Sequence, residues 1–140
     1  MPSEYFIDTE QRLLISRGTG IFGHADFIEH MEAVPADPRF KPEFNHLVDA
    51  RYFERFDLTP AQLMDMGNRS NFGAESKWAL VVSSMLHFGL GRMFANFRGA
   101  QHGHPTNIFS DMGSAMAWLG LPPAYDPNRL GPPTRVGKSG

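Results

Sequence analysis

Two short apolar runs, each followed by a segment with helical character, constrain the fold of this 140-residue chain most strongly. The first run is Leu47-Val48, before Asp49-Ala50-Arg51, and the second spans residues 78–82, before Ser83-Ser84. A short apolar run that stops at small or polar residues is typical of a strand buried on both faces. Such strands require helices packed over the sheet, so the pattern predicts an α/β domain.

The remaining elements follow from apolar periodicity and from capping residues. Strands are expected at residues 5–7, 13–16, 45–49, 77–82 and 106–109. Helices are expected at residues 27–34, at 60–68, after Ser84 and after Asp111. The order ββαβαβαβα predicts one domain over residues 1–120, with a mixed five-stranded sheet and about four helices packed on it. The strand at residues 78–82 is expected in the sheet interior.

Helix starts give the strongest local signals. Thr59-Pro60-Ala61-Gln62 is a capping box with proline at the first helical position. Leu58 and Leu63 flank it at the spacing of a hydrophobic staple. The long third helix is expected to begin after the cap Ser84 and to bury one apolar set: Leu86, Leu90, Met93, Phe94 and Phe97.

Composition excludes several classes of function. The chain has no cysteine, which rules out disulfides and thiolate metal sites. A net charge of −2 offers no cationic surface for nucleic acid. No signal peptide or membrane span is recognisable, so we expect a soluble cytoplasmic protein. Five of the eleven prolines lie in residues 121–140, which predicts a tail that is extended and mobile unless it docks on the domain.

The order of these segments resembles a known family. The residues that carry the resemblance are Leu47-Val48-Asp49-Ala50-Arg51, Lys77-Trp78-Ala79-Leu80-Val81-Val82, Phe88-Gly89-Leu90-Gly91-Arg92-Met93-Phe94, Ile108-Phe109 and Ala115-Met116-Ala117-Trp118-Leu119-Gly120. Together they look like the SpoIIAA-like proteins of the STAS superfamily, over about residues 5–120. The resemblance implies a mixed sheet with helices packed on it and function through partner binding. Some relatives of the wider fold bind apolar or lipidic ligands.

One feature of that family is missing from this chain. In the STAS antagonists of sigma-factor regulation, which this chain resembles, a phosphorylatable serine is expected directly after the third strand. Here that strand leads into Asp49-Ala50-Arg51-Tyr52-Phe53, and no hydroxyl follows until Thr59, which the helix cap explains. A phosphorylation switch and a kinase partner therefore do not carry over.

Polar residues suggest three weak sites. His102 and His104 could supply two metal ligands, but no third lies nearby, and a solvated turn is the simpler explanation. Ser84 and Arg92, with Gly89 and Gly91, look superficially like an anion cradle, although close helix packing also accounts for the glycines.

The third site lies at the end of the third strand, where open α/β sheets tend to place ligand crevices. Its charged residues are Asp49, Arg51, Glu54, Arg55 and Asp57. Exposed ion pairs are the simpler explanation of that alternation. We also expect Arg92 to hold a carboxylate, either Asp49 or Asp111, through its planar fork.

The chain has seven internal methionines and twelve phenylalanines. Methionine side chains are flexible, so this apolar set suits a core or a groove between helices. The leading expectation is a non-catalytic STAS-like regulatory or scaffolding domain that acts by protein contact, with a protein partner or a second copy. The alternative is a carrier or sensor of a small apolar, lipid-like ligand in a Met/Phe-lined pocket. An enzyme using His102, His104 or the Asp49 region is a third hypothesis. No cofactor is expected.

Overall fold

The computed structural model describes residues 3–69, 73, 75–102 and 105–128. Its elements, in chain order, are β1 (Ser3–Asp8), β2 (Leu13–Gly18), β3 (Gly20–Gly23), α1 (His24–Ala36), β4 (Asn45–Asp49), β5 (Phe53–Asp57), α2 (Pro60–Asn68), β6 (Trp78–Val81), α3 (Met85–His102), β7 (Thr106–Phe109) and α4 (Met112–Trp118). In the part of the chain that is described, no helix has the length and apolar character needed to cross a membrane.

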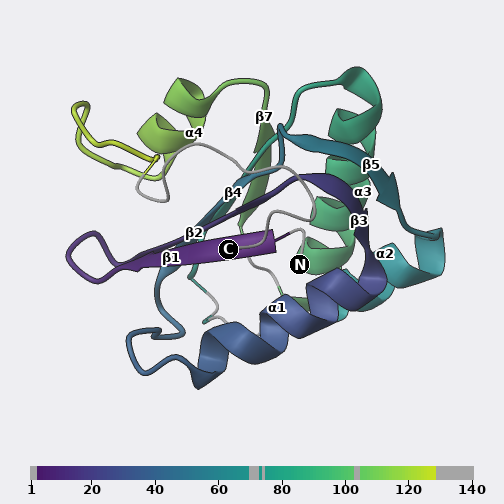
Figure 1. Ribbon diagram of the computed structural model, residues 1–140, viewed down its shortest axis with the longest axis horizontal. Helices are drawn as coiled ribbons and strands as arrows, with labels where there is room; N and C mark the ends of the chain where they lie inside the picture. Colours follow the sequence, from purple (N-terminus) through teal and green to yellow (C-terminus); the bar gives the residue numbers. More distant parts are fainter. Residues whose placement is uncertain (1–2, 70–72, 74, 103–104, 129–140) are drawn as a thin grey trace.

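The main sheet confirms the predicted architecture. Its five strands lie in the order β1-β2-β4-β6-β7. β1 and β2 form an antiparallel hairpin, and every other neighbouring pair is parallel. β6 lies between β4 and β7, so the strand expected in the interior is an interior strand (Figure 1).

Two additional strands form a small second sheet that the sequence pattern did not predict. β3 follows β2 after Thr19, β5 follows β4 after a short turn, and the two strands pair in parallel (Figure 1). Gly20 has φ +75°, a conformation that glycine adopts without strain, at the point where the chain leaves β2. Part of the charged segment after Asp49 is therefore a strand. The local sequence did not reveal it, because its partner, β3, comes from a distant part of the chain.

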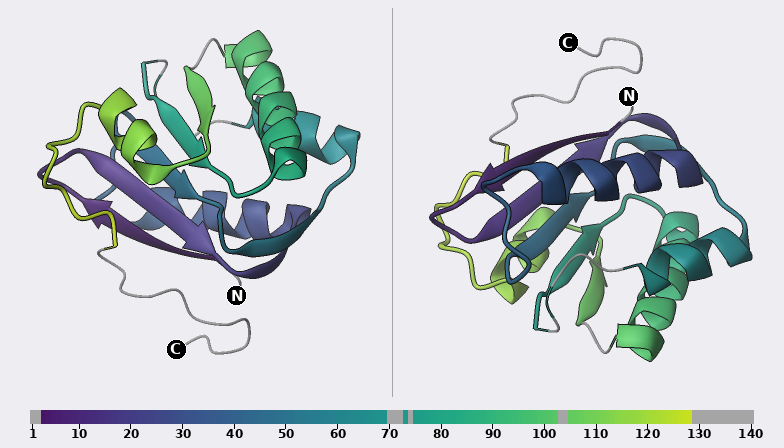
Figure 2. Two further views of the ribbon diagram at one scale, coloured as in Figure 1. Left: turned by 90° about the horizontal axis from the view of Figure 1, so that it is seen from above. Right: turned by 90° about the horizontal axis from the view of Figure 1, so that it is seen from below.

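Helices cover both faces of the main sheet. α1, α2 and α3 pack over one face, which we call the cavity face, through a cluster that includes Phe27, Met31, Leu63, Met66 and Phe94. α4 packs over the opposite face, here the α4 face, with Leu13, Ile15, Leu47, Ala79 and Val81. Figure 2 shows α1 and α4 on opposite sides of the sheet. Successive residues of each strand therefore serve different cores.

The predicted helix caps are confirmed. Thr59 Oγ1 accepts from the Gln62 amide at 3.1 Å, and Gln62 Oε1 accepts from the Thr59 amide at 2.9 Å. Ser84 Oγ accepts from the His87 amide in the first turn of α3. Asp111 Oδ1 accepts from the Ser114 amide at the start of α4.

The buried face of α3 matches the prediction only in part: Phe94 is buried, and Leu90 and Phe97 pack against the core. Leu86 is 71% exposed and Met93 is also exposed, whereas His87 and Arg98 are buried. The inner face predicted from the apolar residues is rotated by about one residue from the observed one. The reason is that two polar side chains, His87 and Arg98, occupy interior positions. Gly91 belongs to this face: a Cβ there would lie 3.1 Å from Ile108 Cγ1, so close packing on β7 explains this glycine.

The segment after α4 is partly docked. Tyr125 is buried in the cluster of the α4 face. Its hydroxyl donates to Asp8 Oδ2 at 2.8 Å, which ties the segment to the end of β1. The rest of the predicted tail, residues 129–140, lies outside the described residues.

Candidate functional site

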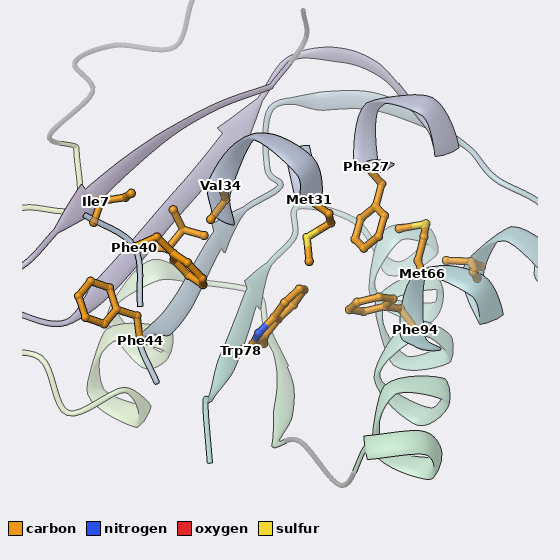
Figure 3. Close-up of a cluster of buried hydrophobic side chains, with 11 residues drawn as sticks. Ile7, Phe27, Met31, Val34, Phe40, Phe44, Met66, Trp78 and Phe94 are labelled. Carbon is orange, nitrogen blue, oxygen red and sulfur yellow. The ribbon is translucent and has the colours of Figure 1, made fainter. Parts of the chain in front are cut away.

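An apolar cavity of about 120 Å³ lies on the cavity face, between the main sheet, the three helices and the small sheet. Almost all of the surface that it presents is apolar. Its principal lining side chains are Phe22, Phe27, Met31, Val48, Phe53, Phe56, Leu58, Leu63, Met66, Trp78, Leu80, Val82, Leu90 and Phe94. Figure 3 shows Phe27, Met31, Met66, Trp78 and Phe94 converging from four different elements.

The cavity lies toward the carboxyl ends of the parallel strands, where open α/β sheets commonly bind ligands. Val48 and Ala50 contribute from β4 and the residue after it, and Val82 directly follows β6. The small sheet forms the roof, defined here as β3 and β5 with the ring cluster of Phe22, Phe53 and Phe56. The fold therefore brings three phenylalanines from two strands, β3 and β5, over one apolar space.

A polar cluster of three side chains borders this space. Ser16 Oγ lies 2.7 Å from His30 Nε2 and 2.7 Å from His46 Nε2. A hydroxyl has one proton, so it donates to one imidazole and accepts from the other. Burial lowers the pKa of His30 to about 4, and burial, with the nearby His30 and Arg98, lowers the pKa of His46 well below its usual value. Both imidazoles are therefore neutral at pH 7.

His87 brings a further imidazole to the wall, beneath the roof. The residue is 8% exposed, and its ring meets the Phe56 ring edge-on with centroids 4.7 Å apart. Its Nδ1 atom is buried without a hydrogen-bond partner among the described residues. Because the cavity surface is nearly all apolar, the imidazoles present mainly ring edges and faces to it. The cavity wall itself suits an apolar group better than an ionic one.

Arg98 lies behind the cavity wall. It is completely buried, and its guanidinium carbon lies 4.0 Å from the centroid of the Trp78 ring. Nη1 donates to Thr106 Oγ1 at 3.0 Å. Arg98 does not line the cavity, but Trp78 contacts both the cavity and the guanidinium.

Of the residues predicted from sequence as weak ligand sites, Asp49, Arg51, Ser84 and Arg92 do not line this cavity, whereas Gly91 does. Arg51 holds Asp49 through two bonds, from Nε to Oδ1 at 2.8 Å and from Nη2 to Oδ2 at 2.9 Å. Ser84 caps α3. Whether any of these residues binds a ligand stays a prediction.

The predicted Arg92 clamp is wrong. Arg92 is exposed on α3 and forms no ion pair with any described residue. The two expected partners are engaged elsewhere: Asp49 binds Arg51, and Asp111 accepts from the Ser114 amide and hydroxyl. The prediction failed because it assigned Met93 to the inner face of the helix.

The histidine pair cannot be placed in a site. His104 and the side chain of His102 lie outside the described residues. Within those ranges, no group of three or more potential metal ligands comes together. A metal role for the pair stays a prediction.

Sequence reasoning missed the polar residues that surround the cavity, namely Ser16, His30, His46, His87 and Arg98. A usable signal was present on α3, where His87, Leu90, Phe94 and Arg98 recur at helical spacing. The alternation of β4 likewise puts His46 on the same face as Val48. Polar residues that occur where the helix or strand pattern calls for an apolar one therefore lie near this cavity.

Comparison with known proteins identifies the fold. A crystal structure of an uncharacterised protein of the DUF3478 family from Shewanella loihica PV-4, described as having a SpoIIAA-like fold, is similar with a TM-score of 0.55 and 18% sequence identity. The similarity covers 84% of this chain and 93% of that one. No family model and no curated protein matches the chain. The chain therefore has a SpoIIAA-like fold, as the sequence resemblance predicted.

Proposed function

We propose that this domain binds a small apolar molecule in the cavity under its roof and does so without catalysing a reaction. The observation that supports the proposal is the cavity itself, about 120 Å³ in volume with an almost wholly apolar wall. Empty apolar cavities of about 150 Å³ stay dry and take up benzene. A ligand that fills such a space restores dispersion contacts that an empty wall lacks.

A carrier or sensor fits the SpoIIAA-like fold without requiring a phosphorylation switch. The wall of the cavity includes α3, whose first turn exposes two large apolar side chains, Met85 at 86% and Leu86 at 71%. Binding next to this helix offers a route by which a ligand could alter the outer surface. In a STAS-like regulatory domain, that surface would transmit the signal.

Toluene titration tests the proposal. Toluene should raise the melting temperature of the wild-type protein, because a ligand that binds only the folded state stabilises it. Ala50→Leu places a larger side chain against the cavity and should weaken binding at least tenfold. Ala117→Leu makes the same change on the exposed surface of α4 and should leave binding unchanged. Absence of toluene binding, or equal binding by the wild type and Ala50→Leu, would contradict the proposal.

Protein contact is the second candidate function, and the exposed Met85 and Leu86 favour it. The partner to test first is a second copy of the chain. Sedimentation velocity should show a dimer for the wild type and a monomer for the double variant Met85→Glu/Leu86→Glu. A monomeric wild type at high protein concentration would remove self-association through this surface.

A further inference from the structure

Arg98 has a hydrogen-bonding capacity that the fold leaves unused. The residue is 0% exposed, and its Nη1 donates to Thr106. Its Nε and Nη2 atoms are buried and have no hydrogen-bond partner in the described part of the chain. Burial lowers the pKa of Arg98 to about 9, so the guanidinium keeps its charge at pH 7.

The unused atoms form the edge of the guanidinium that grips carboxylates elsewhere in this protein. Arg51 binds Asp49 through Nε and Nη2 at 2.8 and 2.9 Å. Arg39 binds Asp37 through the same two atoms at 3.0 and 2.7 Å. Paired bonds of this kind are stronger than neutral hydrogen bonds and match the planar shape of a carboxylate. The same edge of Arg98 points to a carboxylate ligand.

The side chains of this chain do not supply that carboxylate. All fifteen Asp and Glu residues fall within the described ranges, and none of them forms an ion pair with Arg98. A buried charge without a partner is strongly destabilising. A carboxylate on a bound molecule would supply the counter-ion that the Asp and Glu side chains do not.

We propose that Arg98 binds the carboxylate of a small monocarboxylic acid whose apolar body occupies the cavity. This inference rests on the proposed function, since the cavity holds the apolar part. Trp78 connects the two regions, because its ring lines the cavity and stacks on the guanidinium. Arg98 itself lies outside the cavity wall, so the acid group has to pass beside the Trp78 ring to reach it.

The test compares octanoate with its uncharged counterpart methyl octanoate, by calorimetric titration at pH 7. Wild-type protein should bind octanoate at least tenfold more tightly than the ester. Arg98→Met keeps an apolar side chain against Trp78 and should abolish this preference while ester binding persists. Arg92→Met removes an exposed arginine from the same helix and should keep the preference.

A second variant keeps the test decisive if Arg98→Met does not fold. Arg98→Lys retains a positive charge but lacks the two-atom fork, so it should lose most of the preference for the acid. Equal affinity of the wild type for acid and ester would overturn the inference, as would an undiminished preference in either Arg98 variant. Failure of the wild type to bind toluene, octanoate and the ester would instead overturn the proposed function.

Discussion

The two faces of the main sheet are built from the same strands but packed differently. On the α4 face, Leu47, Ala79 and Val81 are 0% exposed within one cluster. On the cavity face, the neighbouring Leu80 is only half-buried and borders open space, and the buried set includes Ser16 and His46. Because side chains alternate along a strand, a single run such as β6 contributes to both. The comparison indicates that the α4 face is closely packed, whereas the cavity face is packed less closely and leaves room for the proposed ligand.

The largest expected effect is a difference in stability between substitutions at two adjacent residues of β6. Val81→Asp puts a carboxylate without a partner into the α4 face and should abolish cooperative folding, since the cost of several kcal/mol approaches a total stability of about 5–15 kcal/mol. Leu80→Asp points toward the cavity and should leave a folded, weakened domain. Thermal unfolding followed by circular dichroism distinguishes them. A cooperative transition for Val81→Asp would contradict both the strand assignment and the difference between the faces.

Acid should destabilise the domain through the cavity face. The pKa of His30 is lowered to about 4 in the fold, from about 6.5 in the unfolded chain, and that of His46 shifts in the same direction. The unfolded chain therefore binds more protons below pH 6.5. Stability should be complete above that pH and fall as pH drops toward 4, by about 3 kcal/mol for His30 alone.

Urea unfolding between pH 7.5 and 4 measures this dependence. His30→Gln removes one of the two titrating imidazoles and should flatten the curve. Constant urea midpoints for the wild type between pH 7 and 4.5 would show that these imidazoles are not buried in the neutral form.

Matched enlargements should show which face has room. Ala79→Leu adds volume to the α4 face, where the residue is 0% exposed, and should cost about 1–3 kcal/mol through overpacking. Ala50→Leu makes the same change beside the cavity and should cost less, because the new side chain can enter open space. Chemical denaturation of both variants measures the difference. Equal losses would mean that the cavity offers no usable volume.

The smallest expected effect concerns the docked segment of the α4 face. Tyr125→Phe removes the hydroxyl that donates to Asp8 and should cost about 1 kcal/mol, with the ring still buried. Ligand binding on the cavity face should not change. Toluene titration of this variant is the check, and weakened binding would show that the two faces are coupled.

The sequence predicted the features that depend on neighbouring residues. The caps at Thr59, Ser84 and Asp111 bond within one helical turn, and the five main strands follow from short apolar runs. The small sheet was missed because β3 and β5 are about thirty residues apart and each has few apolar positions. Pairing between strands so far apart in the sequence produces no clear pattern in the sequence of either strand.

The apolar character of the candidate site was predictable from the sequence, but the residues that surround it were not. The excess of Met and Phe suggested an apolar pocket as the alternative to core packing, and Met31, Met66 and five phenylalanines line the cavity. The position of Arg98 was not predictable, because a basic residue on a helix is normally solvated. Its burial depends on Trp78 and Thr106, which lie on two different strands.

The roof has a consequence for the timing of ligand exchange. Single surface loops move within nanoseconds to microseconds, whereas collective movements of packed elements take microseconds or longer. Here β3 and β5 directly extend β2 and β4 and are hydrogen-bonded to each other, so neither strand moves alone. Opening over Phe22, Phe53 and Phe56 requires the pair to separate or to swing together about the turns that join it to the main sheet. For a ligand whose exit needs this movement, the dissociation rate depends on the joint movement of the two strands as well as on the contacts with the wall.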